Sequence, residues 1–299
     1  MHLLSTQDMT LADIERIFNK ALVKEKEHFR PKIRNSAKKI LANLFYEPST
    51  RTSSSFFSAA TKLGHTVLQI NEVKYSSVTK GETLEDTIRT ISQYADAIVL
   101  RHPDIGAART AANVSDVPII NAGDGAGEHP TQTLLDLYTI WKKCRKQGKD
   151  INGLSITLMG DLKNGRTIHS LLNILRLYNV KITLVSPDNL RLPESVYRDS
   201  TNFNEGRRIA EEPTLTEKIC QDTDVLYVTR VQKERGSVAE YQLTNEQVKH
   251  FKNDMMVMHP LPRNEEIPQW FDNDRRAYYF EQIKNGLYIR MAILEDIFL

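Results

Sequence analysis

The sequence predicts an α/β protein of two domains, each a parallel β-sheet flanked by helices, with the ligand site in the cleft between them. Short apolar runs rich in β-branched residues alternate with longer amphipathic segments, a pattern typical of repeated strand–helix units. Several runs are continuously apolar, as expected for strands that are covered on both faces. The runs form two groups, separated by one long amphipathic segment, so two sheets are expected.

The apolar runs define the expected strands. In the first group these are Ile40–Phe45, Thr66–Ile70, Ala97–Leu100 and Pro118–Asn121. In the second group they are Ser155–Met159, Lys181–Val185, Val225–Val228 and Met255–Met258. Helical spacing of apolar residues predicts helices such as Thr83–Tyr94, Pro130–Arg145 and Thr167–Tyr178. Strand then helix, repeated, indicates parallel strands joined by right-handed crossovers.

The segment Pro130–Lys146 separates the two groups and is expected to form a connecting helix. Glycine and polar residues from 148 to 153 then break the helical pattern. We therefore expect a first domain of residues 1–130 plus 281–299 and a second domain of residues 131–280. The last apolar stretch, Tyr288–Leu299, also has helical spacing, but spacing alone leaves its packing partner open.

The composition is that of a globular protein. Of the 299 residues, 40% are hydrophobic and 26% are charged, which argues against a disordered chain. The net charge of +2 does not indicate nucleic acid or an anionic membrane as a partner. No stretch approaches the ~20 apolar residues that span a bilayer, and Asp8 and Asp13 argue against an N-terminal signal peptide. The isolated Cys144 and Cys220 fit a reducing compartment, so we expect a cytoplasmic protein.

Polar and basic side chains follow the expected strands directly. In open parallel sheets, ligands bind at the carboxyl ends of the strands. At four of these strand ends we expect an arginine to reach the same rim, and these residues are Arg51, Arg101, Arg166 and Arg230. We expect them to concentrate positive charge at one rim, where the anionic groups of a substrate would bind.

The segment Ser49–Thr52 combines three hydroxyl side chains with one guanidinium at the start of an expected helix. Free backbone N–H groups at a helix start favour an anion, and an arginine can grip two phosphate oxygens in one plane. The alternative is a purely structural N-cap, because serine and threonine are common there for local reasons. The place of Arg51 inside the cap, with Arg101 expected nearby, favours a phosphate site.

His129 and Gln132 follow a glycine-rich turn at the start of the connecting helix. Glycines let the backbone approach a ligand closely, and a histidine there can donate to a carbonyl oxygen as negative charge builds on it. The alternative is that His129 only caps the helix. Gln132 lies on the same helical face, and its amide can both donate to and accept from a small polar group.

The segment Gly160–Thr167 nearly fits the nucleotide P-loop pattern, and it follows an expected strand and precedes an expected helix. However, Arg166 stands where that pattern requires lysine, and a planar guanidinium does not reproduce a compact ammonium charge. The strand Val225–Val228 ends in Thr229 and Arg230 rather than in a Mg²⁺-binding aspartate. A carboxylate clamp at Arg166 is therefore favoured over a nucleotide hydrolase.

Seven motifs, in order along the chain, resemble those of the aspartate and ornithine carbamoyltransferases. They are Phe45–Thr52, Lys80–Thr83, Leu100–Pro103, His129–Gln132, Gly160–Thr167, Thr229–Arg235 and His259–Arg263. The last two resemble the aspartate branch, because the ornithine enzymes carry a His-Cys-Leu-Pro segment and residue 260 here is proline. The resemblance implies transfer of the carbamoyl group of carbamoyl phosphate to the amino group of L-aspartate, in pyrimidine biosynthesis, with no metal or cofactor.

The resemblance also implies roles for individual residues. For carbamoyl phosphate, the implied binding residues are Ser49, Thr50, Arg51, Thr52, Arg101, His129, Gln132, Leu261, Pro262 and, from a neighbouring chain, Ser76. For L-aspartate they are Arg166, Arg230, Gln232 and, from a neighbouring chain, Lys80. The residues implied in catalysis are Arg51, Thr52, Lys80, Arg101 and His129. The implied assembly is a homotrimer whose active sites are shared between chains.

Two alternatives remain at this point. A related transferase would carbamoylate another amine, although Arg230, Gln232 and Lys233 favour an acceptor with a second acidic group. A carbamoyltransferase-like chain without activity would serve as a binding or scaffold protein, although every expected polar role is filled here. The sequence leaves open whether a regulatory subunit or another enzyme of the pathway is a partner.

Overall fold

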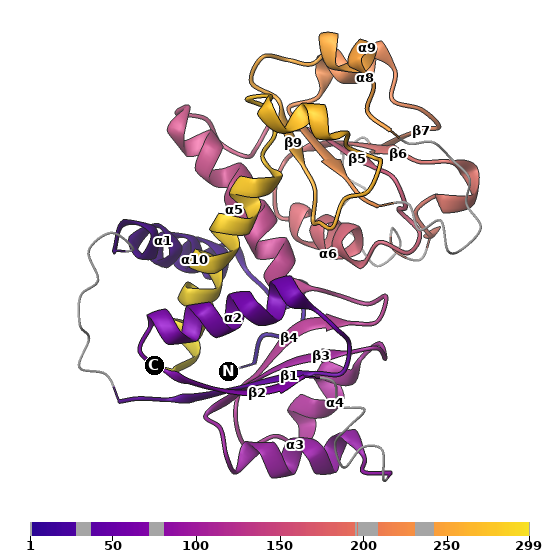
Figure 1. The fold of residues 1–299 in the computed structure, drawn as a ribbon. Coiled ribbons are helices and arrows are strands. Elements are labelled where there is room, and N and C mark those ends of the chain that lie inside the picture. The colour runs from indigo at the N-terminus through magenta and orange to yellow at the C-terminus, as the bar shows by residue number, and fades with distance from the viewer. Residues whose placement is uncertain are drawn as a thin grey trace. The chain divides into compact units, whose positions relative to one another are not determined.

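The chain forms two units in a computed structural model that describes residues 2–27, 37–71, 81–194, 196, 209–230 and 242–298 (Figure 1). Unit 1 comprises Met1–Leu135 with Lys284–Leu299, and unit 2 comprises Asp136–Ile283. Each unit contains a parallel sheet flanked by helices, which confirms the expected fold class. The expected domain limits, at 130/131 and 280/281, lie a few residues before the limits of these units.

In unit 1 the described strands form a parallel sheet in the order β2-β1-β3-β4. Their bounds are Ile40–Phe45 (β1), Thr66–Asn71 (β2), Ala97–His102 (β3) and Ile119–Asp124 (β4). The N-terminal segment extends this sheet, because Leu3 forms a parallel bridge with Ile120 and its N–H donates to the Ile119 carbonyl at 2.9 Å. The carboxyl ends of the four strands therefore meet at one edge.

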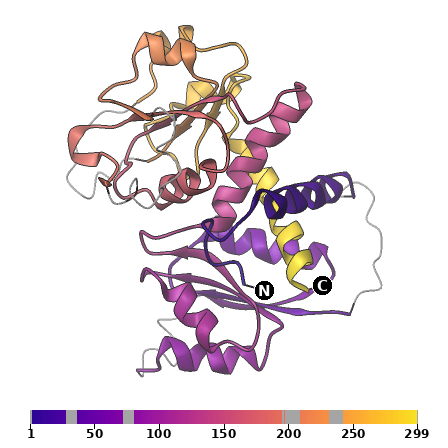
Figure 2. The same ribbon diagram turned by 180° about the vertical axis from the view of Figure 1, so that it is seen from behind.

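Helices cover both faces of the unit 1 sheet. Their bounds are Leu11–Glu27 (α1), Thr50–Lys62 (α2), Leu84–Ser92 (α3) and Ala107–Val114 (α4). Figures 1 and 2 show α3 and α4 on one face of the sheet and α2 on the opposite face. Ile88 of α3 and Ala111 of α4 share a core with Ala42, Leu44 and Leu100, since alternate residues of a strand face the same side. Each fully buried leucine or isoleucine of this core stabilises the fold by about 1.5–3 kcal/mol.

The C-terminal helix α10 (Tyr279–Phe298) packs within unit 1 from Lys284 onward. Its Glu295 accepts a hydrogen bond at 2.8 Å from Lys24 of α1, whose side chain is almost fully buried. Nη1 of Arg290 donates to the hydroxyl of Ser55 in α2 at 3.1 Å. The last apolar stretch of the sequence therefore packs on the helices of unit 1.

In unit 2 the described strands form a parallel sheet in the order β7-β6-β5-β8-β9. Their bounds are Ser155–Met159 (β5), Lys181–Val185 (β6), Ile209–Glu212 (β7), Val225–Val228 (β8) and Met256–Met258 (β9). The edge strand β7 was not expected from the sequence. The four strands of the second expected group are all present, with β9 one residue shorter than expected.

Helices also cover both faces of the unit 2 sheet (Figure 1). Their bounds are Pro130–Lys146 (α5, which begins in unit 1), Arg166–Leu175 (α6), Glu217–Asp222 (α8) and Asn245–Lys249 (α9), with short 3₁₀ turns at Asp188–Leu190 (η3) and Gln269–Asn273 (η6). On the face covered by α8 and α9, Leu226, Val228 and Val257 of the strands share a core with Cys220 and Phe271. Among the described residues, no helix is both long and apolar enough to cross a membrane.

Both cysteines are buried as free thiols. Burial raises the pKa of Cys220 to about 11, and it also raises the pKa of Cys144. A thiol must lose its proton to act as a nucleophile or a metal ligand. These two residues therefore serve packing.

Candidate active site

Ser49 is the cap residue of α2, directly after the end of β1. Its hydroxyl makes no capping hydrogen bond to the described residues of the helix. Instead, Nη1 of Arg101 donates to this hydroxyl at 3.4 Å. Thr50 and Arg51 are exposed in the first turn of α2, whereas Thr52 is buried. The purely structural N-cap alternative therefore does not account for the Ser49 side chain.

Arg101 lies at the carboxyl end of β3, with 14% of its side chain exposed. Its Nε donates to the Glu47 carboxylate at 3.1 Å. The backbone is tied as well, since the Tyr46 N–H donates to the Arg101 carbonyl at 2.9 Å. The ends of β1 and β3 thus bring the guanidinium of Arg101 to the Ser49 loop, a juxtaposition that their parallel register produces.

A carboxylate closes the glycine-rich turn after β4. The backbone N–H groups of Gly106 and Glu128 donate to the two oxygens of Asp124 at 2.9 and 2.8 Å. Gly125 has a φ of 53°, and a Cβ at that position would lie 2.3 Å from the Pro103 carbonyl oxygen. This turn therefore packs against the loop that follows Arg101, and a glycine is required at residue 125.

Glu128 ties the same turn to the N-terminal segment. Its Oε1 accepts the hydroxyl of Ser5 at 2.5 Å. Its Oε2 accepts the N–H and the hydroxyl of Thr6 at 2.9 and 2.7 Å. Both carboxylate oxygens are thus occupied one residue before His129, so the N-terminal segment fixes the path of the backbone into α5.

His129 stands directly before α5 and is 4% exposed. Its backbone carbonyl accepts the N–H groups of Gln132 and Thr133 at 3.0 and 3.1 Å. The helix-capping alternative therefore holds for the backbone of His129, and it leaves the function of the imidazole ring unexplained. Gln132 is half-buried in the first turn of α5.

In unit 2, the loop after β5 is shaped by Gly160 and Asp161. Gly160 has a φ of 119°, and a Cβ there would lie 2.5 Å from the Thr229 carbonyl oxygen at the end of β8. Oδ1 of Asp161 accepts the N–H of Asn164 at 2.9 Å, which closes the loop. Arg166 then follows as the first residue of α6, half-buried.

The backbone amides of this loop argue against a nucleotide P-loop. The N–H groups of Leu162 and Lys163 both donate to the Leu190 carbonyl at 3.1 Å, and the N–H of Asn164 donates to Asp161. A P-loop needs such amides to face the phosphates of the nucleotide. Since three consecutive amides are already used within the protein, the hydrolase alternative is disfavoured.

The remaining expected residues of unit 2 follow β8 and β9. Thr229 is buried and its N–H donates to the Met159 carbonyl at 2.8 Å, which places the half-buried Arg230 next to the Gly160 loop. Leu261 and Pro262 lie in the turn after β9, with Leu261 half-buried and Pro262 exposed. Three expected site residues, Ser76, Lys80 and Gln232, lie outside the described residues.

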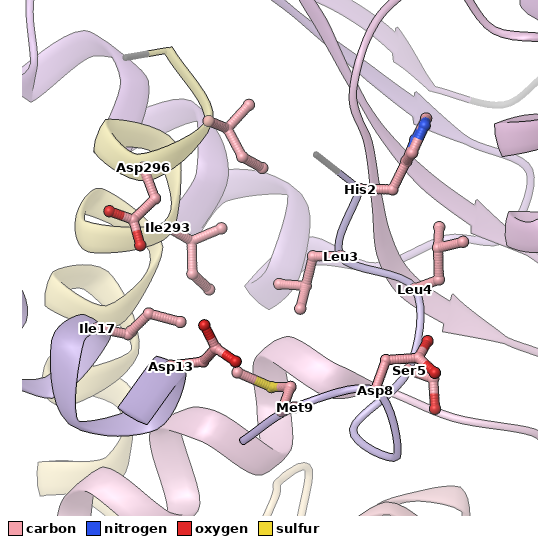
Figure 3. A pocket seen from close by; sticks show the side chains of 11 residues that line it. His2, Leu3, Leu4, Ser5, Asp8, Met9, Asp13, Ile17, Ile293 and Asp296 are labelled. Atoms are coloured by element: carbon pink, nitrogen blue, oxygen red, sulfur yellow. The ribbon is translucent and has the colours of Figure 1, made fainter. Parts of the chain in front are cut away.

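A small pocket in unit 1 lies away from the strand ends (Figure 3). Its volume is about 70 Å³, and aliphatic side chains such as Leu3, Ile17 and Ile293 line much of it. The three carboxylates that line it are ion-paired, Asp8 with Arg109, Asp13 with Arg16, and Asp296 with Lys20 and Arg16. It therefore lacks the cationic character that an anionic substrate requires. Within the described ranges, no group of His, Cys, Asp and Glu side chains is placed to hold a metal ion.

Several residues that support the site were not identified from the sequence. Asp124 and Glu128 belong to a turn that the sequence marked as polar, but their partners lie far away along the chain. His259 belongs to a recognised motif, yet no role was expected for it. The signal that would have identified it is a histidine two residues before the backbone segment that is expected to bind substrate.

Comparisons with known proteins give the family. Residues 1–142 match the family model described as the aspartate/ornithine carbamoyltransferase carbamoyl-P binding domain, and residues 152–297 match that of the Asp/Orn binding domain. The chain is 48% identical to the aspartate carbamoyltransferase catalytic subunit of Archaeoglobus fulgidus, over 100% of this chain and 99% of that protein. It is also 48% identical to the multifunctional protein pyr-3 of Neurospora crassa, where 98% of this chain covers 16% of that longer protein.

A solved structure agrees with this assignment. The aspartate transcarbamoylase of Trypanosoma cruzi, determined in complex with carbamoyl phosphate and aspartate, superimposes with a TM-score of 0.93 at 39% identity. The match covers 99% of this chain and 96% of that chain. The resemblance inferred from seven short motifs is thus confirmed over the length of both units, and the chain belongs to the aspartate/ornithine carbamoyltransferase family.

Proposed function

We propose that this chain is the catalytic polypeptide of an aspartate carbamoyltransferase. It transfers the carbamoyl group of carbamoyl phosphate to the amino group of L-aspartate, which yields N-carbamoyl-L-aspartate and phosphate. The observation that carries the proposal is the placement of cationic side chains at carboxyl strand ends in both units. Arg101 lies beside Ser49 in unit 1, and Arg166 and Arg230 follow β5 and β8 in unit 2.

In unit 1, the first turn of α2 would hold the phosphate. Backbone N–H groups at the start of this helix, the hydroxyls of Ser49, Thr50 and Thr52 and the guanidinium of Arg51 all suit an oxyanion. Arg101 would bridge the phosphate and the carbonyl oxygen of the carbamoyl group, because it already reaches the Ser49 hydroxyl. The phosphate half of the proposal therefore rests on contacts within a single unit.

The carbamoyl group would be recognised by three further elements. The imidazole of His129 and the hydroxyl of Thr52 would donate to its carbonyl oxygen. The side chain of Gln132 and the backbone carbonyls of Leu261 and Pro262 would accept from its amide. An amide group offers two donors, so acceptors are required at this position.

In unit 2, Arg166, Arg230 and Gln232 would hold the two carboxylates of L-aspartate. A guanidinium forms paired, charge-assisted hydrogen bonds with a carboxylate. An acceptor with a cationic side chain, such as ornithine, would be repelled by the same residues. This charge pattern favours the aspartate reaction over other carbamoyl transfers.

The chemistry proceeds by nucleophilic attack. The amino nitrogen of L-aspartate forms a bond with the carbamoyl carbon, and a tetrahedral intermediate places negative charge on the former carbonyl oxygen. The bond from carbon to the phosphate oxygen then breaks, phosphate leaves, and the amine loses a proton. Because the second substrate supplies the nucleophile, the protein contributes positioning and charge stabilisation by Arg51, Thr52, Arg101 and His129.

The proposed assembly is a cytoplasmic homotrimer in which Ser76 and Lys80 of a neighbouring chain complete each site. A complementation experiment tests it with chains carrying Arg51→Ala or Lys80→Ala. Each variant alone is expected to be inactive, and mixed trimers are expected to recover activity because some sites then contain both native residues. Mixed trimers that stay inactive would contradict the shared site.

The activity itself is tested with the purified chain, carbamoyl phosphate and a panel of amino acids, with the product identified by mass spectrometry. The expected product is N-carbamoyl-L-aspartate, together with one phosphate per turnover. Citrulline formed from ornithine would indicate the other branch of the family. The absence of any carbamoylated product would support an inactive scaffold protein instead.

A further inference from the structure

His259 is a buried histidine at the end of β9 that the proposed chemistry does not use. It is 1% exposed, and both of its ring nitrogens are engaged. The backbone N–H of Leu261 donates to Nδ1 at 2.8 Å. Nε2 lies 2.9 Å from the Oε1 of Glu266, which is also buried. The ring therefore stands between a carboxylate and the backbone turn that carries Leu261 and Pro262.

This geometry selects one tautomer of His259. A backbone N–H can only donate, so Nδ1 must accept and carries no proton. Nε2 then carries the proton and donates to Glu266. Burial raises the pKa of Glu266, but hydrogen bonds from His259 and from the N–H of Asn264 outweigh this effect and lower the pKa. Glu266 is therefore ionised at neutral pH and holds the Nε2–H form in place.

The backbone of His259 is anchored by a second set of buried side chains. Its N–H donates to the Oε1 of Gln282 at 2.8 Å, and the amide of Gln282 donates to Asp136 at 2.8 Å. The hydroxyl of Tyr227 donates to the other oxygen of Asp136 at 2.7 Å. Burial, followed by the charge of Asp136, raises the pKa of Tyr227 well above its usual value, so it stays a donor. The turn after β9 is thus tied to α5, β8 and α10.

The turn itself contains one unfavourable backbone conformation. Leu261 has a φ of 55°, which lies in the left-handed region that is unfavourable for a residue with a Cβ. The hydrogen bond from its N–H to Nδ1 of His259 stabilises this conformation and constrains the backbone of the turn. The orientation of the carbonyl groups of Leu261 and Pro262 would decide whether the small amide of a substrate can donate hydrogen bonds to them.

We propose that His259 is a positioning residue, whose neutral Nε2–H tautomer, held by Glu266, aims the carbonyl oxygens of Leu261 and Pro262 at the amide of the carbamoyl group. This inference rests on the proposed function. Its immediate consequence is that the acceptor at Nδ1 matters more to the reaction than the donor at Nε2. The roles of the two ring nitrogens can be tested separately by substitution.

The test compares His259→Asn with His259→Gln. An asparagine oxygen accepts the N–H two residues further along the chain, as in an Asx turn, and so replaces Nδ1. The longer glutamine amide replaces the Nε2–H donor to Glu266 and leaves the Leu261 N–H without its acceptor. Because the partly buried N–H of Leu261 would lose its acceptor, which is unfavourable, we expect kcat/KM for carbamoyl phosphate to be about tenfold lower in His259→Gln than in His259→Asn. The KM for L-aspartate should change less than this.

A spectroscopic measurement on the unmodified chain supplements the kinetics. With ¹⁵N-labelled histidine, the His259 ring should show a protonated Nε2 and an unprotonated Nδ1 across the neutral pH range. A protonated Nδ1 would overturn the inference, even if both variants fail to fold. The partly exposed His250, replaced by asparagine, is the control that should leave kcat/KM unchanged.

The outcomes of the two experiments separate the inference from the function on which it rests. An active wild-type chain with equal kcat/KM in both His259 variants would overturn the inference alone. A wild-type chain that shows the expected tautomer but forms no N-carbamoyl-L-aspartate would overturn the proposed function. The expected tautomer together with the expected order of the two variants supports both.

Discussion

The two units hold their strand-end loops in different ways. In unit 1, carboxylates clamp the loops through nearby backbone N–H groups and hydroxyls, as Asp124 and Glu128 do before His129. In unit 2, a network of buried side chains links α5, β8 and α10 to the turn after β9. Asp136 and Tyr227 of this network are fully buried.

This difference indicates how the strand-end loops of each unit should respond to substitution. A carboxylate clamp in unit 1 acts on the loop segments directly bonded to it, so its loss should change one kinetic constant and little of the stability. A buried network rigidifies several elements together, and an unsatisfied member is costly. Substitutions within the unit 2 network should therefore change stability and catalysis together.

The largest effect is expected for His129→Ala in unit 1. Loss of one donor to a developing oxyanion typically costs about 2.7–4 kcal/mol, which corresponds to a 10²–10³-fold lower kcat. Steady-state kinetics at saturating substrates measure it, and the melting temperature should change little. The corresponding change at His250, a partly exposed histidine in unit 2, should leave kcat intact. Unchanged turnover in His129→Ala would remove this residue from the mechanism.

The next largest effect is expected for Arg166→Ala and Arg230→Ala in unit 2. Each removes a charge-assisted hydrogen bond worth about 1.5–3 kcal/mol, so KM for L-aspartate should rise about 10–150-fold. Initial rates at varied L-aspartate provide the measurement. The matched control is Arg191→Ala, because Arg191 lies in the same unit with a half-exposed side chain paired to Asp188. An equal rise in the control would show that the net charge of unit 2, rather than specific contacts with the carboxylates of L-aspartate, determines the KM for L-aspartate.

A pair of glycines compares the two units directly. Gly125→Ala drives a Cβ into the Pro103 carbonyl after Arg101, and Gly160→Ala drives one into the Thr229 carbonyl before Arg230. Overpacking of this kind costs about 1–3 kcal/mol. Gly125→Ala should raise KM for carbamoyl phosphate, whereas Gly160→Ala should raise KM for L-aspartate.

Gly64→Ala controls for backbone strain in both glycine variants. Gly64 has a φ of 87°, but a Cβ there meets no atom within 4 Å. Gly64→Ala should lower the melting temperature slightly and leave the KM values for carbamoyl phosphate and L-aspartate unchanged. If both active-site glycine variants shift the same KM, the assignment of one substrate to each unit is wrong.

A smaller effect is expected for Glu128→Gln. The amide nitrogen would face a donor at Ser5 or Thr6, which costs about 1 kcal/mol. We expect kcat to be about fivefold lower, because the backbone that leads into His129 is then less constrained. Little loss of stability is expected. The exposed Glu265, replaced by glutamine, is the control. A loss of stability without a change of kcat would mean that Glu128 serves the fold alone.

The smallest effect concerns the pH dependence of the unit 2 network. The pKa of Glu266 is lowered in the folded chain. Its contribution to stability is therefore present above the pKa of the unfolded chain and is lost as pH falls through the folded value. The melting temperature of the wild type should exceed that of Glu266→Gln at neutral pH, and the difference should shrink in acid. A difference independent of pH would show that Glu266 is not ionised in the folded chain.

The carboxyl ends of the strands were predictable from the sequence, whereas the side chains that hold the following loops in place were not. Largely apolar runs identified β1 and β8 residue for residue, and parallel strands imply that Arg101 approaches Ser49. Helical spacing at Ile14, Ile17 and Phe18 also marks α1, although that helix was not among the expected elements. The edge strand β7 has largely exposed residues and no apolar run, so no pattern identifies it.

The side chains that hold these loops in place do so through contacts between residues that are far apart in the sequence. Ser5 and Glu128 are separated by 123 positions, and Tyr227 and Asp136 by 91. Each is an ordinary polar residue in its local context, and periodicity describes only local context. Only the folded chain shows that these residues meet.

The central claim is that carbamoyl phosphate binds to unit 1 and L-aspartate to unit 2. It is tested most directly by isothermal titration calorimetry of carbamoyl phosphate against the wild type, Arg101→Ala and Arg166→Ala. Loss of Arg101 should weaken binding by about 1.5–3 kcal/mol, whereas loss of Arg166 should leave the affinity unchanged. Equal weakening by the two substitutions, or none by Arg101→Ala, would contradict the division of substrates between the two units.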